Sequence, residues 1–408
     1  MSIQEVRAQF PILSGSVYGK PLVYLDNAAT SQRPLSVIDK YESLLFESNA
    51  NIHRAVHALA ARATEEYEST RDYVCEFLNA GSREEIVFTS GTTASINLVA
   101  FSFGESFVQE GDEVIVTVAD HHSNIVPWQM MCSRKKAVLK ALEISKNGVL
   151  SVDALRKLIS RRTKIVAIPH ISNVLGLVNP VREIAAFCHE NAIPVLVDGA
   201  QGVVHEKIDV RGMDCDFYAF SGHKVFAATG TGVLYGKKRW LDAMVPFMGG
   251  GEMIETVRFS GTNYAPLPQK FEAGTQNFNA VPTLKPALEF HLGCIEDPAL
   301  QEELRRRDEF ILESLLRDSR IRLFGVPRGT EMKVPVYSFM VEGAHHEDLA
   351  LILDKMGIAV RSGKMCAEPL MDHLGVTGMV RASFGPYNGM EDAEAFLASL
   401  DRAIKMLV

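Results

Sequence analysis

The sequence predicts an α/β fold, in which a mostly parallel sheet is covered by helices and is followed by a smaller α+β domain. From about residue 85, short apolar runs alternate with helical patterns, an order that builds parallel sheets. Runs such as IVAI at 165–168 and VLV at 195–197 are apolar at every position, which indicates strands buried on both faces. After about residue 285 a long charged helix and short strands follow, which predicts a second domain.

The elements follow from periodicity, from β-rich runs and from helix caps such as Ser151. In the first part we expect strands at 86–88, 113–118, 164–169, 193–197, 217–220 and 232–235, and helices at 92–100, around Trp128, at 151–160 and at 181–190. In the second part we expect helices at 299–317, at 348–356 and from 391, and strands at 321–324, 334–341, 358–361 and 379–383. We divide the chain into an N-terminal segment (1–20) that packs with the smaller domain, a large domain (21–284) and the small domain (285–408).

Composition excludes some classes of function. The 408 residues suit two domains at ~100–200 residues each. A net charge of −8 argues against a nucleic-acid binder, which needs a basic face. The N-terminus lacks a signal-peptide pattern, and no apolar stretch approaches the length of a membrane span. We therefore expect a cytoplasmic protein that binds neither nucleic acid nor membrane, with six reduced cysteines.

Two charged residues follow buried strands at the edge where α/β sheets bind ligands. Asp198 ends the strand in VLVDGAQ, and Lys224 follows the strand in DFYAFSGHK. Asp198 alone fits a turn cap as well as a partner for a cationic ring nitrogen. Lys224 alone fits a surface lysine as well as a Schiff-base amine with a lowered pKa. A strand-end carboxylate and a strand-end lysine together are what pyridoxal phosphate requires.

Three further motifs carry candidate chemistry. FTSGTTASINL runs through Gly91 into a helix that opens with Thr92 and Thr93, which suits either an ordinary cap or an anion site. His121 and His122 follow a strand without carboxylate or thiol partners at metal spacing, so we predict no metal and favour a ring that stacks on a cofactor. Cys366 lies in the loop RSGKMCAEP, where nearby basic residues favour a thiolate.

Together these motifs resemble the class V aminotransferase family, and within it the SUF-type (group II) cysteine desulfurases. The resemblance runs from YLDNAAT at 24–30 to VRAS at 380–383. Its most specific parts are FSGHK, VDGAQ, the SGTT turn, the histidine of ADHHSNIVPW, and RSGKMCAEP. It implies fold type I of the pyridoxal-phosphate enzymes, with a seven-stranded sheet in the large domain.

The resemblance also implies residue roles. Lys224, Cys366 and His121 would be catalytic, with His121 stacked on the ring. The substrate L-cysteine, or L-selenocysteine as an alternative, would be bound by Arg381 with Asn173 as its companion, by Arg361, and by His53 and Arg54 at the cleft mouth. Pyridoxal 5′-phosphate would be held by Thr92, Thr93, His121, Asn173, Asp198, Gln201, Ser221, His223 and Lys224, with Thr275 in FEAGTQN reaching it from the second subunit of a homodimer.

The implied reaction leaves alanine and a persulfide on Cys366, which passes to an acceptor protein or thiol for iron–sulfur cluster or other sulfur-compound assembly. Two positions depart from the family pattern. Ala227-Ala228 replaces a Gly-Pro after the lysine, which would loosen the turn there, and Lys364 replaces a histidine two residues before Cys366. The alternatives are an aminotransferase, which would not need Cys366, a selenocysteine lyase, and a non-catalytic scaffold.

Overall fold

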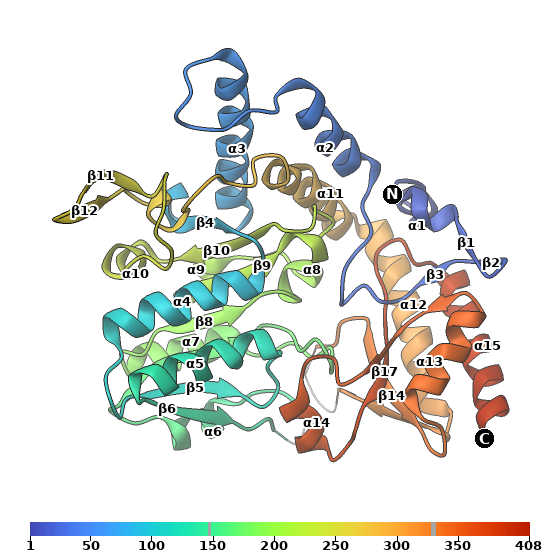
Figure 1. The fold of residues 1–408 in the computed structure, drawn as a ribbon. Helices are drawn as coiled ribbons and strands as arrows, with labels where there is room; N and C mark the ends of the chain where they lie inside the picture. Colours follow the sequence, from blue (N-terminus) through green and yellow to red (C-terminus); the bar gives the residue numbers. More distant parts are fainter. Residues whose placement is uncertain (146–147, 328–331) are drawn as a thin grey trace.

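A seven-stranded sheet forms the centre of the larger lobe (Figure 1). The computed structural model describes residues 1–145, 148–327 and 332–408. The strand order is β4-β10-β9-β8-β7-β5-β6, and β10 alone runs antiparallel to its two neighbours, which confirms the predicted mostly parallel sheet. The strands are β4 (Ile86–Thr89), β5 (Glu113–Thr117), β6 (Val138–Leu142), β7 (Thr163–Pro169), β8 (Val195–Asp198), β9 (Phe217–Ser221) and β10 (Gly232–Gly236).

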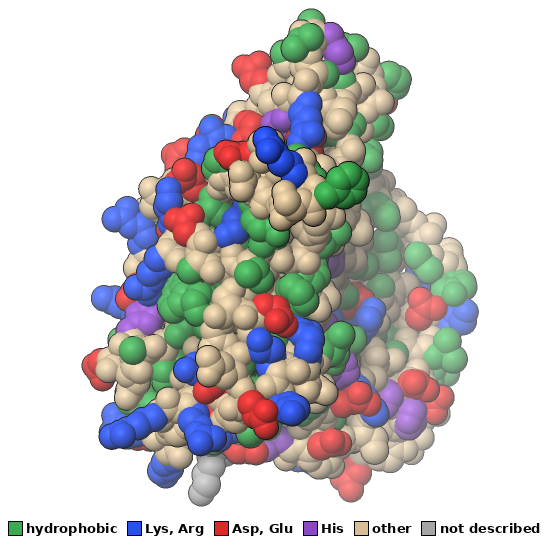
Figure 2. Space-filling model, turned by 60° about the vertical axis from the view of Figure 1, so that its left-hand side comes forward, with side chains coloured by type: hydrophobic (Ala, Val, Ile, Leu, Met, Phe, Trp, Pro, Cys, Tyr) green, Lys and Arg blue, Asp and Glu red, His purple; other side chains and the backbone are tan. Residues whose placement is uncertain are grey.

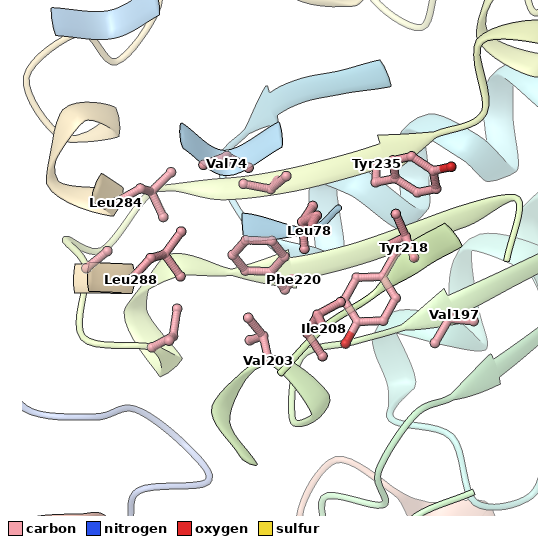
Figure 3. Packing of buried hydrophobic residues seen from close by; sticks show 14 of the residues in the cluster. Val74, Leu78, Val197, Val203, Ile208, Tyr218, Phe220, Tyr235, Leu284 and Leu288 are labelled. Carbon is pink, nitrogen blue, oxygen red and sulfur yellow. The ribbon is translucent and has the colours of Figure 1, made fainter. Parts of the chain in front are cut away.

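Both faces of this sheet are buried, as the continuously apolar runs predict. Successive side chains of a strand point to opposite faces. In β9, Tyr218 and Phe220 join one apolar cluster, whereas Phe217 and Ala219 join the other. Figure 3 shows the first cluster, where side chains of α3, α8 and α11 pack on β8, β9 and β10. Helices α4, α5 and α10 supply the second.

The helices of the larger lobe differ from prediction before the sheet and also after residue 200, where α8, α9, α10 and α11 were not predicted. Helix α4 extends seven residues beyond the expected end, and the long helices α2 and α3 were not predicted. Helix α3 buries the polar residues Thr70 and Arg71, so its buried face does not read as an apolar stripe. The helices are α1 (Ile3–Ala8), α2 (Leu35–Glu47), α3 (Ala58–Phe77), α4 (Thr92–Phe107), α5 (Val126–Lys135), α6 (Val152–Leu158), α7 (Val181–Glu190), α8 (Gly202–His205), α9 (Val210–Met213), α10 (Lys238–Ala243) and α11 (Leu284–Glu296).

The smaller lobe is a four-stranded antiparallel sheet with helices packed against it, in the orange and red part of Figure 1. Its strand order is β13-β14-β17-β16. The strands are β13 (Ile321–Phe324), β14 (Val336–Val341), β16 (Arg361–Gly363) and β17 (Met379–Ser383), and the helices are α12 (Pro298–Arg317), α13 (His346–Lys355), α14 (Glu368–Leu374) and α15 (Met390–Leu407). This agrees with the expected smaller α+β unit.

The N-terminal residues contact both lobes. Arg7 forms an ion pair with Asp392 at 2.9 Å, and the ring of Phe10 packs on Phe226 of the larger lobe and on Tyr387 of the smaller. Three short pairings complete the strands: β1 (Ser16–Val17) with β2 (Lys20–Pro21), β3 (Val23–Tyr24) with β15 (Ile358–Ala359), and β11 (Ile254–Arg258) with β12 (Gly261–Tyr264). The domain boundaries at 20/21 and 284/285 remain predictions.

Basic and acidic side chains are interspersed over the face seen in Figure 2. Within the described ranges, no helix combines the length and the apolar character needed to cross a bilayer.

A buried ion pair joins α3 to the sheet. Nη1 and Nη2 of Arg71 donate to the Glu272 carboxylate, at 2.7 and 2.8 Å, Nη1 also donates to the Ile86 carbonyl, and Nε donates to Glu68 at 3.1 Å. Glu272 accepts further hydrogen bonds from the Phe88 N–H and the Tyr67 hydroxyl. Because every donor and acceptor is matched, this pair can be buried without a stranded charge.

We predict that Arg71→Met lowers the free energy of unfolding by about 3–5 kcal/mol, because it leaves the Glu272 carboxylate buried without its cation. Urea unfolding followed by circular dichroism measures this loss. Arg62→Met is the matched control on the same helix, since it removes only an exposed ion pair to Glu47 and should change little. Equal losses in the two variants would contradict the prediction.

Candidate active site

The carboxyl ends of the parallel strands meet at one edge of the sheet, and the polar residues that follow them line a single cavity of about 220 Å³. Thr92, Thr93, His121, Asp198 and Lys224, which the sequence places after strands, all lie there, whereas His122 does not line the cavity. The cavity is lined by Ala28, Ala29, Thr92, Thr93, His121, Ser123, Pro169, Ile171, Asn173, Asp198, Ala200, Gln201, Ser221, His223 and Lys224 from the larger lobe, and by Arg361, Met365, Cys366 and Arg381 from the smaller. The site is therefore built by both lobes.

A larger cavity, of about 750 Å³, lies between α8, α11 and α12 and the residues around Lys333. Among the described residues that line this larger cavity, none directly follows a strand of the seven-stranded sheet. The lining residues nearest to such a strand end are Val204, His205 and Glu206, at the end of α8. Chemistry rather than size identifies the smaller cavity as the candidate site.

A buried acid and a partly buried amine both line the smaller cavity. Asp198 ends β8, and Lys224 follows β9 in a short 3₁₀ turn. Burial raises the pKa of the Asp198 carboxyl, against the opposing effect of Lys224 and of the hydrogen bond from the Ala200 N–H at 2.9 Å. Burial lowers the pKa of the Lys224 amine, and Asp198 opposes that shift. The lowered pKa favours a neutral, nucleophilic amine.

The turn behind Lys224 is closed despite the Ala-Ala departure. The Ala227 N–H donates to the Gly222 carbonyl at 2.9 Å, and the Ala228 N–H donates to the Thr283 hydroxyl at 3.1 Å. A proline at either position would lack that donor. The expectation that the alanines loosen this turn is therefore not supported by its hydrogen bonds.

Hydroxyl and amide groups gather at one end of the cavity. Gly91 precedes α4 with a φ of +147°, a conformation that side chains disfavour. The Thr92 N–H donates to the Ser221 Oγ at 2.8 Å, and the two hydroxyls lie 2.7 Å apart. Strand β10 packs tightly against this turn: a Cβ added to Gly232, its first residue, would lie 2.3 Å from the Gly91 Cα. This turn can present N–H and hydroxyl donors to an anion.

Two histidines of the cavity are neutral at ordinary pH. Burial lowers the pKa of His121 to about 4, with the nearby Lys224 charge acting in the same direction. Burial also lowers the pKa of His223 to about 4. The His121 Nδ1 accepts from the Ser123 N–H at 3.1 Å, which leaves the hydrogen of the neutral ring on Nε2.

Arg381 projects from β17 and is buried. Its Nη1 donates to the Asn173 carbonyl at 2.9 Å, and its Nη2 pairs with Asp26 at 3.2 Å, while Nε has no partner among the described residues. Arg361 approaches the other Asp26 oxygen at 3.5 Å. The guanidinium is thus held in orientation by two of its five N–H donors, and further donors remain for a small carboxylate.

Cys366 lies between β16 and α14, is exposed and borders the cavity. Met365 and Cys366 both have a φ of +54°, a left-handed conformation that costs about 1–2 kcal/mol for each residue. Lys364 pairs with Glu368 at the surface. Among the other thiols, burial raises the pKa of Cys132 to about 11 and those of Cys188 and Cys294 to about 12, so these stay protonated.

Three predicted site residues do not line the cavity of a single chain. His53 pairs with Glu68 at 3.0 Å, and Arg54 pairs with Glu252 at 3.1 Å. Thr275 is exposed elsewhere on the surface. Their roles in binding remain predictions.

Some residues of the site were missed by the sequence reasoning. Ser123 binds both His121 and Thr93 through its hydroxyl, at 3.1 and 2.7 Å, and Asp26 joins the two arginines. Ser123 follows the histidine pair and Asp26 lies in YLDNAAT, so both stood in motifs already noted. A serine or an aspartate in a sequence does not show which residue it will bind, so these two contacts could not be predicted without the fold.

Comparison with known proteins agrees with this arrangement. The family model described as "Aminotransferase class-V" matches residues 23–396. A protein of Vibrio cholerae named "Probable cysteine desulfurase" is 43% identical over all of both chains, and a "Cysteine desulfurase" of Cronobacter sakazakii is 42% identical over 100% of this chain and 99% of its own. The crystal structure of the Escherichia coli cysteine desulfurase CsdA, in its S-sulfonic acid form, aligns with a TM-score of 0.90 at 39% identity over all of both chains. The chain belongs to the class V aminotransferase family.

Proposed function

We propose that this protein is a pyridoxal-phosphate-dependent cysteine desulfurase, which releases L-alanine from L-cysteine and retains the sulfur on Cys366. One observation carries the proposal: an exposed thiol from the smaller lobe borders the same cavity as the buried Asp198 and the partly buried Lys224. An aminotransferase needs the acid and the amine but has no use for the thiol. The names of relatives that are 41–45% identical over nearly the whole chain support the same activity.

The residues present fit pyridoxal 5′-phosphate. Asp198 is buried and accepts one hydrogen bond among the described residues, so its second oxygen is available to a protonated ring nitrogen. The buried Gln201 Oε1 has no partner in the described chain, and a donor on the ring would satisfy it. Thr92, Thr93, Ser221 and His223 offer donors for the phosphate at the start of α4. His121 lines the cavity as the ring that would stack on the cofactor.

When bound, the cofactor supplies an electron sink for the α-carbon of the amino acid. The chain's own residues supply the rest. Arg381 lines the cavity and orients the substrate carboxylate through N–H groups that Asn173 and Asp26 leave unused, with the Asn173 carbonyl holding the guanidinium. The Lys224 amine, whose pKa is lowered by burial, takes and returns the proton at the α-carbon.

The transfer step then takes place at sulfur. The Cys366 thiolate attacks the substrate sulfur, a sulfur–sulfur bond forms, and the carbon–sulfur bond of the substrate breaks. A proton replaces sulfur on the β-carbon, so L-cysteine and the Cys366 thiol give L-alanine and a Cys366 persulfide without an external oxidant. Because Cys366 is exposed, an acceptor protein or thiol can collect the sulfur for iron–sulfur cluster or other sulfur-compound assembly. Six unpaired cysteines favour a cytoplasmic setting.

Cys366→Ala tests the proposed function. We expect the visible absorption of the bound cofactor to persist and alanine release from cysteine to fall by about two orders of magnitude or more, because the nucleophile is absent. Wild-type protein mixed with cysteine should gain about 32 Da on the peptide that contains residue 366. Cys75→Ala, away from the cavity, should retain full activity. Undiminished alanine release by Cys366→Ala would refute the role of this thiol, and a parallel assay with selenocysteine distinguishes a selenocysteine lyase.

Asp198→Asn tests the cofactor's proposed partner. Loss of the buried charge should lower turnover about a hundredfold, or ~2.7 kcal/mol of transition-state stabilisation, since a neutral amide does not keep the ring nitrogen protonated. The assay is alanine release at matched cofactor content. Asp216→Asn is the control, because Asp216 lies before β9 and binds His189 at 2.7 Å, outside the cavity. A similar loss in both variants would attribute the effect to folding.

We also propose that the active form is a homodimer in which Thr275 completes the partner's phosphate site. Thr275 does not line its own chain's cavity, and it is exposed. The hairpin of β11 and β12, which extends from the lobe in Figure 1, exposes Val257, Phe259 and Tyr264. Exposed apolar side chains of this kind are typical of an interaction surface.

Co-expression of Thr275→Val chains with Lys224→Ala chains tests this arrangement. If Thr275 acts across the interface, a mixed dimer contains one complete site, and random pairing restores about a quarter of the wild-type sites. Each variant alone should bind the cofactor weakly or be inactive. Cofactor content and alanine release measure the recovery. No recovery in the mixture, although mixed dimers are isolated, would place Thr275 in its own chain's site or outside any site.

A further inference from the structure

His122, the second histidine of the pair, is not part of the cavity lining. Its ring lies beyond the cavity and faces the start of α14 in the smaller lobe, where Nε2 accepts from the Glu368 N–H at 3.1 Å. The backbone N–H of His122 donates to the Cys366 carbonyl at 2.8 Å. One residue of the larger lobe therefore binds the loop of the smaller lobe on both sides of Ala367.

The backbone of this loop does not hold its own conformation. Met365 and Cys366 are consecutive non-glycine residues with left-handed φ angles, which an unconstrained chain avoids. Ala367, the cap of α14, makes no side-chain hydrogen bond to the helix. Within the loop, the Ala367 N–H donates to the Lys364 carbonyl at 3.0 Å. The Ala367 carbonyl accepts from the Leu370 and Met371 N–H groups of α14, both at 3.1 Å. The larger lobe binds the Met365 and Cys366 carbonyls and the Glu368 N–H.

Those bonds are directional and few. The Asn173 side chain donates to the Met365 carbonyl at 3.0 Å, and His122 provides the two bonds given above. The Met365 side chain is buried in an apolar cluster that includes Ala119, Val174 and Leu175 of the larger lobe. Met365 thus anchors the loop by packing, whereas His122 holds the carbonyl of the cysteine itself and the amide at the start of α14.

We propose that His122 is a positioning residue, which holds the Cys366 loop in its left-handed conformation so that the thiol faces the cavity. The catalytic consequence of this inference rests on the proposed function, whereas the hydrogen bonds of His122 are independent of that function. The ring must accept at Nε2, so its hydrogen is on Nδ1 in the neutral form. Loss of the ring would leave the Glu368 N–H without its acceptor and let the loop relax toward ordinary φ angles.

The substrate should still bind when the ring is removed, because Arg381 and Asn173 are untouched. We expect His122→Ala holoenzyme to lose about tenfold in kcat for alanine release, with KM for cysteine within about twofold, as loss of one positioning hydrogen bond predicts. Backbone amide exchange of residues 364–370 should become about tenfold faster. His122→Gln, whose side-chain oxygen can accept the Glu368 N–H, should recover most of both effects.

His373→Ala is the matched control. His373 lies near the end of α14, the helix whose start binds His122, and its side chain is as exposed as that of His122. It pairs with Glu143 of the larger lobe at 2.8 Å and does not bind the loop. It should leave kcat and the exchange of residues 364–370 at wild-type values. The proposal is overturned if His122→Ala leaves amide exchange unchanged, or if His122→Gln behaves like His122→Ala. Amide exchange is measured without substrate, so an inactive wild-type protein would refute the desulfurase assignment and still leave this measurement decisive for His122.

Discussion

The site depends on one buried acid and one partly buried amine at the edge of a sheet whose two faces are both covered by apolar side chains. Asp198 and Lys224 follow the neighbouring strands β8 and β9, and burial destabilises the charged form of each. Neither group is satisfied fully by the described chain. A buried charge without sufficient partners is costly, and the cavity between the lobes is the place where a bound group with complementary charge offsets that cost.

The two lobes contribute different kinds of group. The larger lobe supplies the strand-end residues that would bind a cofactor, and they are rigid because each follows a strand buried on both faces. The smaller lobe supplies Arg381, Arg361 and Cys366. Arg381 is on a strand, and its neighbours determine its orientation, whereas Cys366 is on a loop. The Cys366 loop therefore depends on the hydrogen bonds that cross between the lobes, from His122 and Asn173, because no helix or strand fixes its conformation.

The strand-end residues were predictable because parallel strands end at a common edge, so Asp198, Lys224, Thr92 and His121 could be grouped without coordinates. The mostly parallel sheet and the smaller α+β unit followed from periodicity. Helix α3 was not predicted, because its buried face contains Arg71, whose principal buried partner is Glu272, 201 residues later in the chain. The hydrogen bonds of His122 and the pairing of Asp26 with Arg381 join residues 244 or more positions apart, and no local pattern encodes such distances.

The close approach of Gly232 to Gly91 has a consequence for how the sheet assembles. Strand β10 is the one strand that runs against its neighbours, and its first residue lies opposite both Thr89 of β4 and Ser221 of β9. Sliding β10 by one position would bring the valine at 233 against the glycine turn, where even a methyl group has no room, and would also exchange the two buried faces of the strand. The Gly91 turn thus sterically excludes a shifted register of the reversed strand.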